Sequence, residues 1–149
     1  MKGLVQYFYL SPTHCDSNRV LEVLHSCTHN RAPLGLGFRQ GGATNQLWAF
    51  VPRDDGYYEI INKHSRTVLD DSSCGGGQGA LVYIYERHLG ANQQWRIKQA
   101  GQEDVVQVVS RINSDSVLDV FSYSQEPGAR MVLWPNHHNN NQVWRLFRA

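Results

Sequence analysis

The sequence lacks a marked excess of charge of either sign, a long apolar run and any cluster of cysteines. Its 149 residues contain 14 Lys and Arg against 13 Asp and Glu, so the formal net charge is +1, and only 18% of residues are charged. Nucleic-acid binding relies on a basic stripe that contacts phosphates, so this balance argues against a nucleic-acid partner. A polar but weakly charged surface suits a neutral polar ligand instead.

No segment of the sequence is long and apolar enough to cross a bilayer, so no membrane insertion is expected. The apolar stretch from Leu4 to Leu10 is short, is interrupted by Gln6 and is not followed by a small-residue cleavage site. We expect this stretch to form the first strand of the fold and not a signal peptide. The expected location is therefore the cytoplasm, or the exterior after secretion without a signal peptide.

Cysteine is scarce, with Cys15, Cys27 and Cys74 as the three positions. An odd count without a secretion signal favours reduced thiols, and a Cys15–Cys27 bridge is the alternative. There is no C-x-x-C motif or Cys/His cluster, and the adjacent His137 and His138 would point to opposite faces of a strand. Neither a metal nor another cofactor is expected.

The most informative feature that is present is a short word, Asn-Gln-x-Trp, that occurs three times. Its tryptophans are 47 and 49 residues apart, so a unit of about 48 residues is written three times in the chain. The three copies are Asn45–Trp48, Asn92–Trp95 and Asn141–Trp144.

Two upstream features recur with the same period. A Val-Leu-acid word precedes each tryptophan by 27 or 28 residues, and an aromatic residue precedes it by ten. The acids are Glu22, Asp70 and Asp119, and the aromatics are Phe38, Tyr85 and Trp134. The first repeat is one residue longer, and the alignment places the extra residue between its acid and its aromatic, near Pro33.

Each repeat contains four short runs that are typical of strands, and turn-rich segments separate them. The turns lie at 53–56, 73–79, 99–104 and 125–128. The expected strands are 4–10, 20–24, 34–38 and 47–51 in the first repeat, 57–62, 67–71, 80–86 and 94–98 in the second, and 105–112, 116–121, 131–134 and 143–147 in the third.

This pattern predicts a single all-β domain with repeats at about 3–51, 56–98 and 104–148. A period near 48 also fits the blades of a propeller, but propellers need at least four blades. Three four-stranded units favour a closed barrel capped by hairpins with pseudo-threefold symmetry, because closure removes exposed strand edges.

The three Gln-x-Trp words, each preceded by Val-Leu-Asp or Val-Leu-Glu, resemble those of the ricin B-chain type of β-trefoil lectin over nearly the whole chain. The residues themselves indicate that Trp48, Trp95 and Trp144 are core residues, since large apolar side chains recur there with the symmetry. The glutamine of each word is expected to brace neighbouring backbone, because a buried amide needs hydrogen-bond partners.

A sugar site needs a carboxylate and an amide for the hydroxyls and an aromatic plate for the C–H face. In the third repeat the resemblance implies that Asp119, Trp134 and Asn141 are binding residues. We add His137, which lies three residues past the aromatic. The alternatives are that Asp119 belongs to a turn network and that Trp134 lies in the core.

The second repeat offers a matching set, and the first departs from it. The second-repeat candidates are Asp70, Tyr85, His88 and Asn92. The first-repeat candidates are Glu22, Phe38 and Asn45, with Gly41 in the position of the histidines. Because glutamate is one methylene longer than aspartate, the first site is expected to be weak or inactive.

The resulting hypothesis is a non-catalytic, multivalent lectin that recognises galactose- or N-acetylgalactosamine-containing glycans on glycoproteins or glycolipids, the sugar preference being implied by the resemblance. No nucleophile–base set recurs, and the carboxylates lie about 48 residues apart instead of paired across a cleft, which argues against an enzyme. The alternative is a protein-binding trefoil, either an inhibitor or a cytokine-like module. The oligomeric state is left open, including a homodimer.

Overall fold

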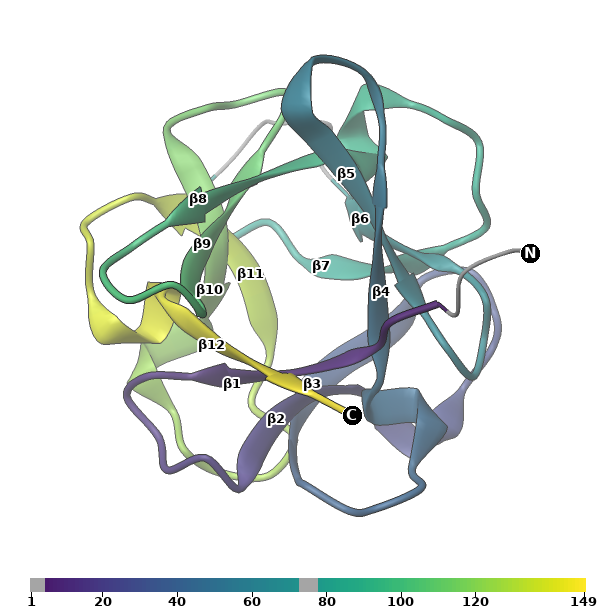
Figure 1. The fold of residues 1–149 in the computed structure, drawn as a ribbon, viewed down its shortest axis with the longest axis vertical. Helices are drawn as coiled ribbons and strands as arrows, with labels where there is room; N and C mark the ends of the chain where they lie inside the picture. Colours follow the sequence, from purple (N-terminus) through teal and green to yellow (C-terminus); the bar gives the residue numbers. More distant parts are fainter. Residues whose placement is uncertain (1–4, 73–77) are drawn as a thin grey trace.

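The computed structural model describes residues 5–72 and 78–149, which form an all-β fold of twelve strands joined by loops and single 3-10 turns (Figure 1). Cys74 and most of the turn expected at 73–79 lie outside the described residues. Cys15 and Cys27 are free thiols, and burial raises the pKa of the Cys15 thiol. Within the described ranges, no helix is long and apolar enough to span a membrane.

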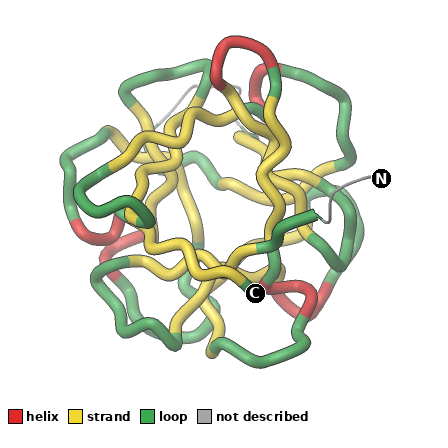
Figure 2. The backbone as a smooth tube through the Cα atoms, viewed as in Figure 1, coloured by secondary structure: helices red, strands yellow, loops and turns green. Residues whose placement is uncertain are grey.

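Six antiparallel strands close into a barrel, which Figure 2 shows as a ring of strand segments. Closure is completed where the first strand pairs with the last, for example at Leu10 and Leu146, and with β4 at Phe8 and Trp48. The barrel strands are β1 (Phe8–Pro12), β4 (Trp48–Pro52), β5 (Tyr57–Asn62), β8 (Trp95–Gln99), β9 (Val105–Ser110) and β12 (Trp144–Arg148).

The other six strands form three hairpins that cap one end of the barrel. They touch one another in a triangle, through Ala32 and Ile84, Leu81 and Val132, and the backbone of Leu36 and Ala129. The first lobe is thus β1–β4, the second β5–β8 and the third β9–β12. The hairpins are β2 (Arg19–Val23) with β3 (Ala32–Phe38), β6 (Val68–Asp71) with β7 (Val82–Tyr85), and β10 (Ser116–Val120) with β11 (Met131–Pro135).

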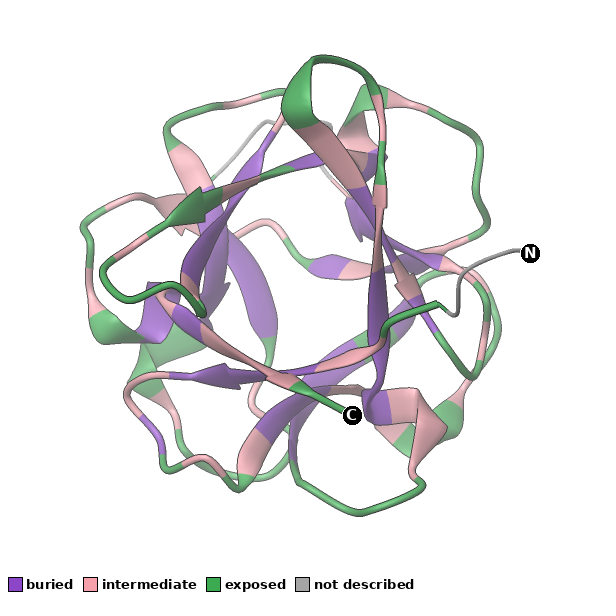
Figure 3. Ribbon diagram, in the orientation of Figure 1, coloured by how far each residue is buried: buried purple, intermediate pink, exposed green. Residues whose placement is uncertain are grey.

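The three repeated tryptophans lie in the core between barrel and hairpins, as predicted. Trp48, Trp95 and Trp144 are completely buried, and the buried segments in Figure 3 line the inside of the fold. Each indole N–H donates to the carbonyl of the leucine in the Val-Leu-acid word of its own lobe, at 3.1, 3.1 and 3.3 Å. The tryptophan therefore ties the barrel to the hairpin both by packing and by a satisfied polar contact.

The predicted strands are confirmed in number and order, and most of their boundaries agree within two residues. The exception is the first strand, which was expected at 4–10 but begins at Phe8 and ends at Pro12. The apolar Val5 is 63% exposed because pairing with β12 starts only at Phe8. Hydrophobicity alone therefore placed this strand too early.

Replacing Trp144 with alanine should lower the free energy of unfolding by about 3–5 kcal/mol, because it leaves a large cavity and an unpaired Leu118 carbonyl. Urea denaturation followed by circular dichroism measures the change. The matched control is Trp134→Ala, which removes a half-buried tryptophan of the same lobe and should cost less than half as much. Equal losses would contradict the core role assigned to Trp144.

Candidate functional site

The glutamine of each Asn-Gln-x-Trp word braces its lobe, as predicted, and also holds the candidate acid. In the third lobe Nε2 of Gln142 donates to Asp119 Oδ2 at 3.0 Å and to the Pro135 carbonyl at 2.9 Å. Its Oε1 accepts the backbone N–H of His137 at 2.9 Å. Gln93 and Gln46 make the corresponding three contacts in their lobes. One buried amide thus joins both hairpin strands to the following loop.

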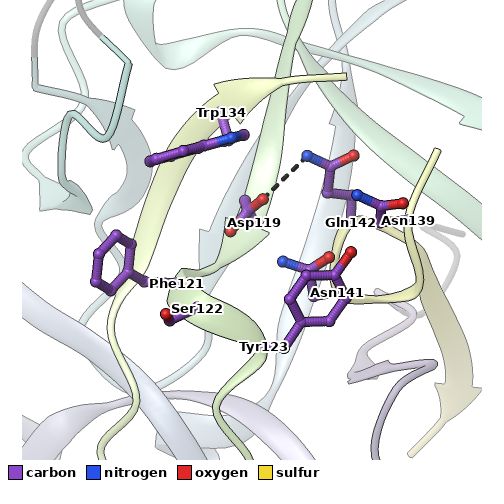
Figure 4. Close-up of a pocket in the computed structure, with 8 residues that line it drawn as sticks. All are labelled: Asp119, Phe121, Ser122, Tyr123, Trp134, Asn139, Asn141 and Gln142. Carbon is purple, nitrogen blue, oxygen red and sulfur yellow. Dashed lines mark hydrogen bonds between the residues drawn. The ribbon is translucent and has the colours of Figure 1, made fainter. Parts of the chain in front are cut away.

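In the third lobe these elements surround a cavity of about 300 Å³ (Figure 4). The acid comes from the end of β10, the tryptophan from β11, and two aromatic residues from the turn η5 (Phe121–Tyr123). The amides come from the turn η6 (Asn140–Gln142) and from Asn139 directly before it. The lining residues are Asp119, Phe121, Ser122, Tyr123, Trp134, Asn139, Asn141 and Gln142.

Two hydrogen-bond acceptors at this cavity are buried and only partly used. Asp119 and Asn141 are each 3% exposed. Gln142 donates to one carboxylate oxygen of Asp119, and the side-chain amide of Asn141 also lies close enough to this carboxylate to lower its pKa. Asn141 donates through Nδ2 to the Val120 carbonyl at 3.1 Å, while its buried Oδ1 has no partner among the described residues. Because buried polar atoms are normally satisfied, this acceptor is available to a hydrogen-bond donor from a water or a ligand.

Burial raises the pKa of the Asp119 carboxyl to about 6, since desolvation disfavours the charged form. The hydrogen bonds from Gln142 and Asn141 and the nearby His137 lower the pKa but only partly offset the effect of burial. The ionised form of this carboxylate is therefore costly, and any further hydrogen-bond donor would stabilise it. Such perturbed groups at a cavity are candidates for function.

The aromatic walls include residues that the sequence did not single out. Trp134 is half-buried and lines the cavity, so it is not a core residue, and its ring centroid is 6.1 Å from that of Phe121. Ser122 and Tyr123 take left-handed backbone angles, with φ of 60° and 56°, which directs the turn η5 toward the cavity. The clue in the sequence was the pair of aromatics just after Val-Leu-Asp-Val, but it has no counterpart in the other repeats.

A loop of the first lobe supports this turn. Nε2 of His14 lies 2.9 Å from the Ser124 carbonyl, which requires that nitrogen to carry the proton. The His14 ring also packs edge-on against Tyr123, with centroids 6.1 Å apart. The candidate His137, in contrast, is exposed and does not line the cavity; its backbone, not its ring, contacts the brace. His137 and His138 both follow β11, so the strand geometry assumed for them is wrong.

The second lobe brings its candidates together but engages the acid more fully. Asp70 is 3% exposed, and its two oxygens accept from Gln93 at 3.0 Å and from Asn92 at 3.3 Å. Nε2 of His88 lies 3.9 Å from Asp70, and the His88 ring packs edge-on against Tyr85. Burial again raises the pKa of Asp70. A sugar hydroxyl would here compete with contacts that the lobe already makes.

The first lobe departs from the repeat in a way that overturns the alignment of Phe38 with Tyr85 and Trp134. The Gln46 amide binds the carbonyl of Phe38, whereas its counterparts bind the carbonyls of Glu86 and Pro135. Strand pairing gives the same shift, because the valine of each Val-Leu-acid word faces the plate position. These pairs are Val20 with Gly37, Val68 with Tyr85, and Val117 with Trp134.

Gly37 therefore stands where the other lobes carry the aromatic plate. The extra residue of the first repeat was placed near Pro33, but it lies in the Gln40–Gln46 loop. Gln40, not Gly41, takes the position of the histidines, since its N–H reaches the brace. Counting back ten residues from the tryptophan failed because this loop, and not the hairpin, absorbs the insertion.

The Glu22 side chain occupies the space that the missing aromatic leaves. A Cβ atom added to Gly37 would overlap the Glu22 carboxylate, which accepts from Gln46 at 2.9 Å. Phe38 is 50% exposed, and the guanidinium of Arg19 covers its ring at 4.2 Å. Asn45 keeps its place and donates to the Val23 carbonyl at 2.9 Å. This lobe retains the brace but not the acid–plate arrangement.

The fold and the third-lobe site define a trefoil with an acid–amide–aromatic pocket, and comparison with known proteins agrees. The model of the ricin-type beta-trefoil lectin domain-like family matches residues 7–85, 44–134 and 91–149, so the chain belongs to this family, a carbohydrate-binding class. No match was found among curated proteins.

Solved structures share the fold. The designed threefold-symmetric protein ThreeFoil is 33% identical, with a TM-score of 0.86 over 94% of this chain and 96% of its own. An exo-beta-1,3-galactanase, 1,3Gal43A from Clostridium thermocellum, is 26% identical with a TM-score of 0.89; the match covers all of this chain but 31% of the enzyme. The C-half of an earthworm R-type lectin, solved with GalNAc, is 19% identical with a TM-score of 0.75 over 97% and 99% of the two chains.

The space taken by Glu22 predicts an energetic coupling with Gly37. Gly37→Ala should push the carboxylate off Gln46 and lower the free energy of unfolding by about 1 kcal/mol. In a Glu22→Asp background the same change should cost less, which a double-mutant cycle by urea denaturation measures. Gly41→Ala is the control, because nothing lies within 4 Å of its added Cβ. A purely additive cycle would contradict the overlap.

The raised pKa of Asp119 predicts a pH-dependent effect of Asp119→Asn on stability. The folded protein binds the Asp119 proton more tightly than the unfolded chain does, so this group favours folding less as pH rises from the ordinary Asp range through about 6. Asp119→Asn should therefore raise the free energy of unfolding more at pH 7 than at pH 4. Urea denaturation at both pH values, with the exposed Asp115→Asn as the charge control, measures the difference. If Asp119→Asn changes the free energy of unfolding equally at both pH values, the pKa of Asp119 is not raised by folding.

Proposed function

We propose that this protein is a non-catalytic lectin whose third lobe binds a terminal galactose or N-acetylgalactosamine residue. The observation that carries the proposal is the convergence of Asp119 and the unpartnered Oδ1 of Asn141 on one cavity beside the Trp134 ring. Both are acceptors, so they suit a ligand that presents hydroxyl donors. Family membership supports the same class of ligand.

The chemistry of a pyranose fits these three groups. Adjacent hydroxyls can donate to the carboxylate and to the amide oxygen, and the hydrogen bond to the carboxylate is of the stronger, charge-assisted kind. The axial 4-hydroxyl of galactose leaves the hydrogens of C3, C4 and C5 on one face, which can stack on the Trp134 ring. The similarity to a lectin solved with GalNAc and to part of a galactanase supports the galacto preference.

The second lobe is proposed as a weaker site and the first as inactive. Asp70 is already held by two amides and approached by His88, whereas Glu22 fills the plate position of its lobe. Two sites on one rigid body would bind clustered glycans on glycoproteins or glycolipids with an avidity raised by about 10²–10⁴. The acids belong to separate hairpins and are not paired across a cleft, which supports a binding role over hydrolysis.

Asp119→Ala should weaken galactose binding more than tenfold, because it removes a charge-assisted hydrogen bond worth about 1.5–3 kcal/mol. Asp70→Ala should leave the strongest site intact but abolish cross-linking of a multivalent galactose ligand. NMR titration with galactose and turbidity with a galactosylated polymer measure the two effects.

Asp115→Ala is the control, because it removes an exposed carboxylate from the same lobe. Undiminished galactose binding in the Asp70→Ala/Asp119→Ala double variant would contradict the assignment of these two acids to sugar sites. A wild-type protein that responds to no sugar on a glycan array would favour a protein-binding trefoil instead.

A further inference from the structure

A second cavity, of about 800 Å³, lies beside the first-lobe loop that carries the extra residue, and its lining also includes Lys63 of the second lobe and the end of β12. It shares no lining residue with the third-lobe cavity. Its walls include Tyr7, Tyr9, Arg39, Gly42, Lys63 and Arg148, and we call it the basic groove. Gly42, in the loop with the extra residue, has a φ of 82°, and nothing lies within 4 Å of a Cβ atom added to it.

Two of the cations are held in place by aromatic rings. The guanidinium carbon of Arg39 lies 5.5 Å from the centroid of Tyr9 and 5.2 Å from that of Phe147. The ammonium of Lys63 lies 4.8 Å from the centroid of Tyr7. Contacts of this kind orient a cation without neutralising it. An anion that binds here therefore meets side chains that are already ordered, which lowers the entropic cost of binding.

No Asp or Glu lines this groove, and the carboxylate of the terminal residue Ala149 stands against three cations, those of Arg39, Lys63 and Arg148. The five ion pairs found among the described residues use neither Arg39, Lys63 nor Arg148. Residues 1–4 and 73–77, which the structure does not describe, contain no Asp or Glu in the sequence. Several cations of one sign in a concave site attract an anion.

The equivalent positions at the other two lobe boundaries show that this charge is specific to the boundary between the first and second lobes. Lys63, Arg111 and Thr13 are equivalent, because each donates its backbone N–H to the residue before the repeated tryptophan. Arg111 lies 3.8 Å from Asp55 and donates to Gln94, while Thr13 is neutral.

Arg39 likewise has two equivalents, Arg87 and Asn136, each one residue before the N–H that binds the brace. Arg87 binds the buried Glu59 through both carboxylate oxygens at 2.8 and 3.0 Å. Asn136 pairs with Gln107 through two reciprocal amide hydrogen bonds. The boundary between the first and second lobes is thus the one of the three that leaves a cation at both positions without an acidic or amide partner among the described residues.

We propose that the basic groove is a second ligand site, which binds the sulfate or carboxylate group of an acidic saccharide. The volume falls within the range of small-molecule sites and exceeds what a bare inorganic anion needs, and tyrosine side chains line it. The inference rests on the proposed function only in taking the ligand to be a sugar. The anion site itself does not use Asp119 or Asp70.

The test isolates the groove by working in the Asp70→Ala/Asp119→Ala background. Galactose 6-sulfate should still bind this variant at low salt, with NMR shifts at the groove and an affinity that falls as salt is added. Adding Arg39→Gln and Lys63→Gln should weaken that binding about tenfold. The matched control is Arg96→Gln/Lys98→Gln, which removes the same charge from exposed positions of the second lobe, where Arg96 also lies over a tyrosine.

Three results would overturn the proposal: unchanged binding in the groove variant, an equal loss in the control, or galactose 6-sulfate binding no more tightly than inorganic sulfate. Lys63→Gln alone repeats the test if the thermal unfolding midpoint shows that the double change harms folding. Neutral galactose is titrated into the wild type in parallel. If neutral galactose fails to bind while galactose 6-sulfate still binds, the proposed galactose site of the third lobe is contradicted and the proposed ligand site in the basic groove is not.

Discussion

The three hydrogen bonds of one buried glutamine amide in each lobe are the interaction on which the rest of the structure depends. In the third lobe Gln142 binds the acid of one hairpin strand, the end of the other strand and the loop between them and the barrel. A buried amide left without partners costs about 1–3 kcal/mol, so the three groups are fixed together. Two residues later, Trp144 lies in the core and its indole N–H donates to the Leu118 carbonyl of the same hairpin. Core and site are therefore specified by one short word.

Because each lobe has its own brace, a lobe can change its ligand chemistry without losing its fold. The third lobe keeps a buried carboxylate and an unpartnered amide oxygen beside an aromatic wall. The second lobe satisfies its acid internally, through Asn92, Gln93 and the approach of His88. The first lobe has Gly37 in place of the aromatic residue, and the Glu22 side chain occupies the space beside it. The symmetry of the scaffold thus does not extend to the sites.

The lobes also differ in how barrel side chains support the loop before each bracing glutamine. The second lobe uses an ion pair, Glu59 with Arg87, and the third uses two amides, Gln107 with Asn136. The first lobe uses an arginine over aromatic rings, which supports the loop without consuming the positive charge. The loop before the bracing glutamine is thus supported by a different pair of side chains in each lobe. As a result, a chain whose net charge is only +1 has one local cationic groove.

The sequence by itself determined the all-β trefoil, the buried tryptophans and the bracing glutamines. These depend on alternation, turn residues and a period of about 48, which are visible locally and are repeated three times. The position of the extra residue, and with it the role of Phe38, could not be read from spacing, because hairpin register decides which loop absorbs an insertion.

Only the tertiary structure brought Phe121 and Tyr123 to the third-lobe acid and placed Arg39 and Lys63 in one groove. It also raised the pKa of Asp119 to about 6, since a carboxyl group loses water only when other segments cover it.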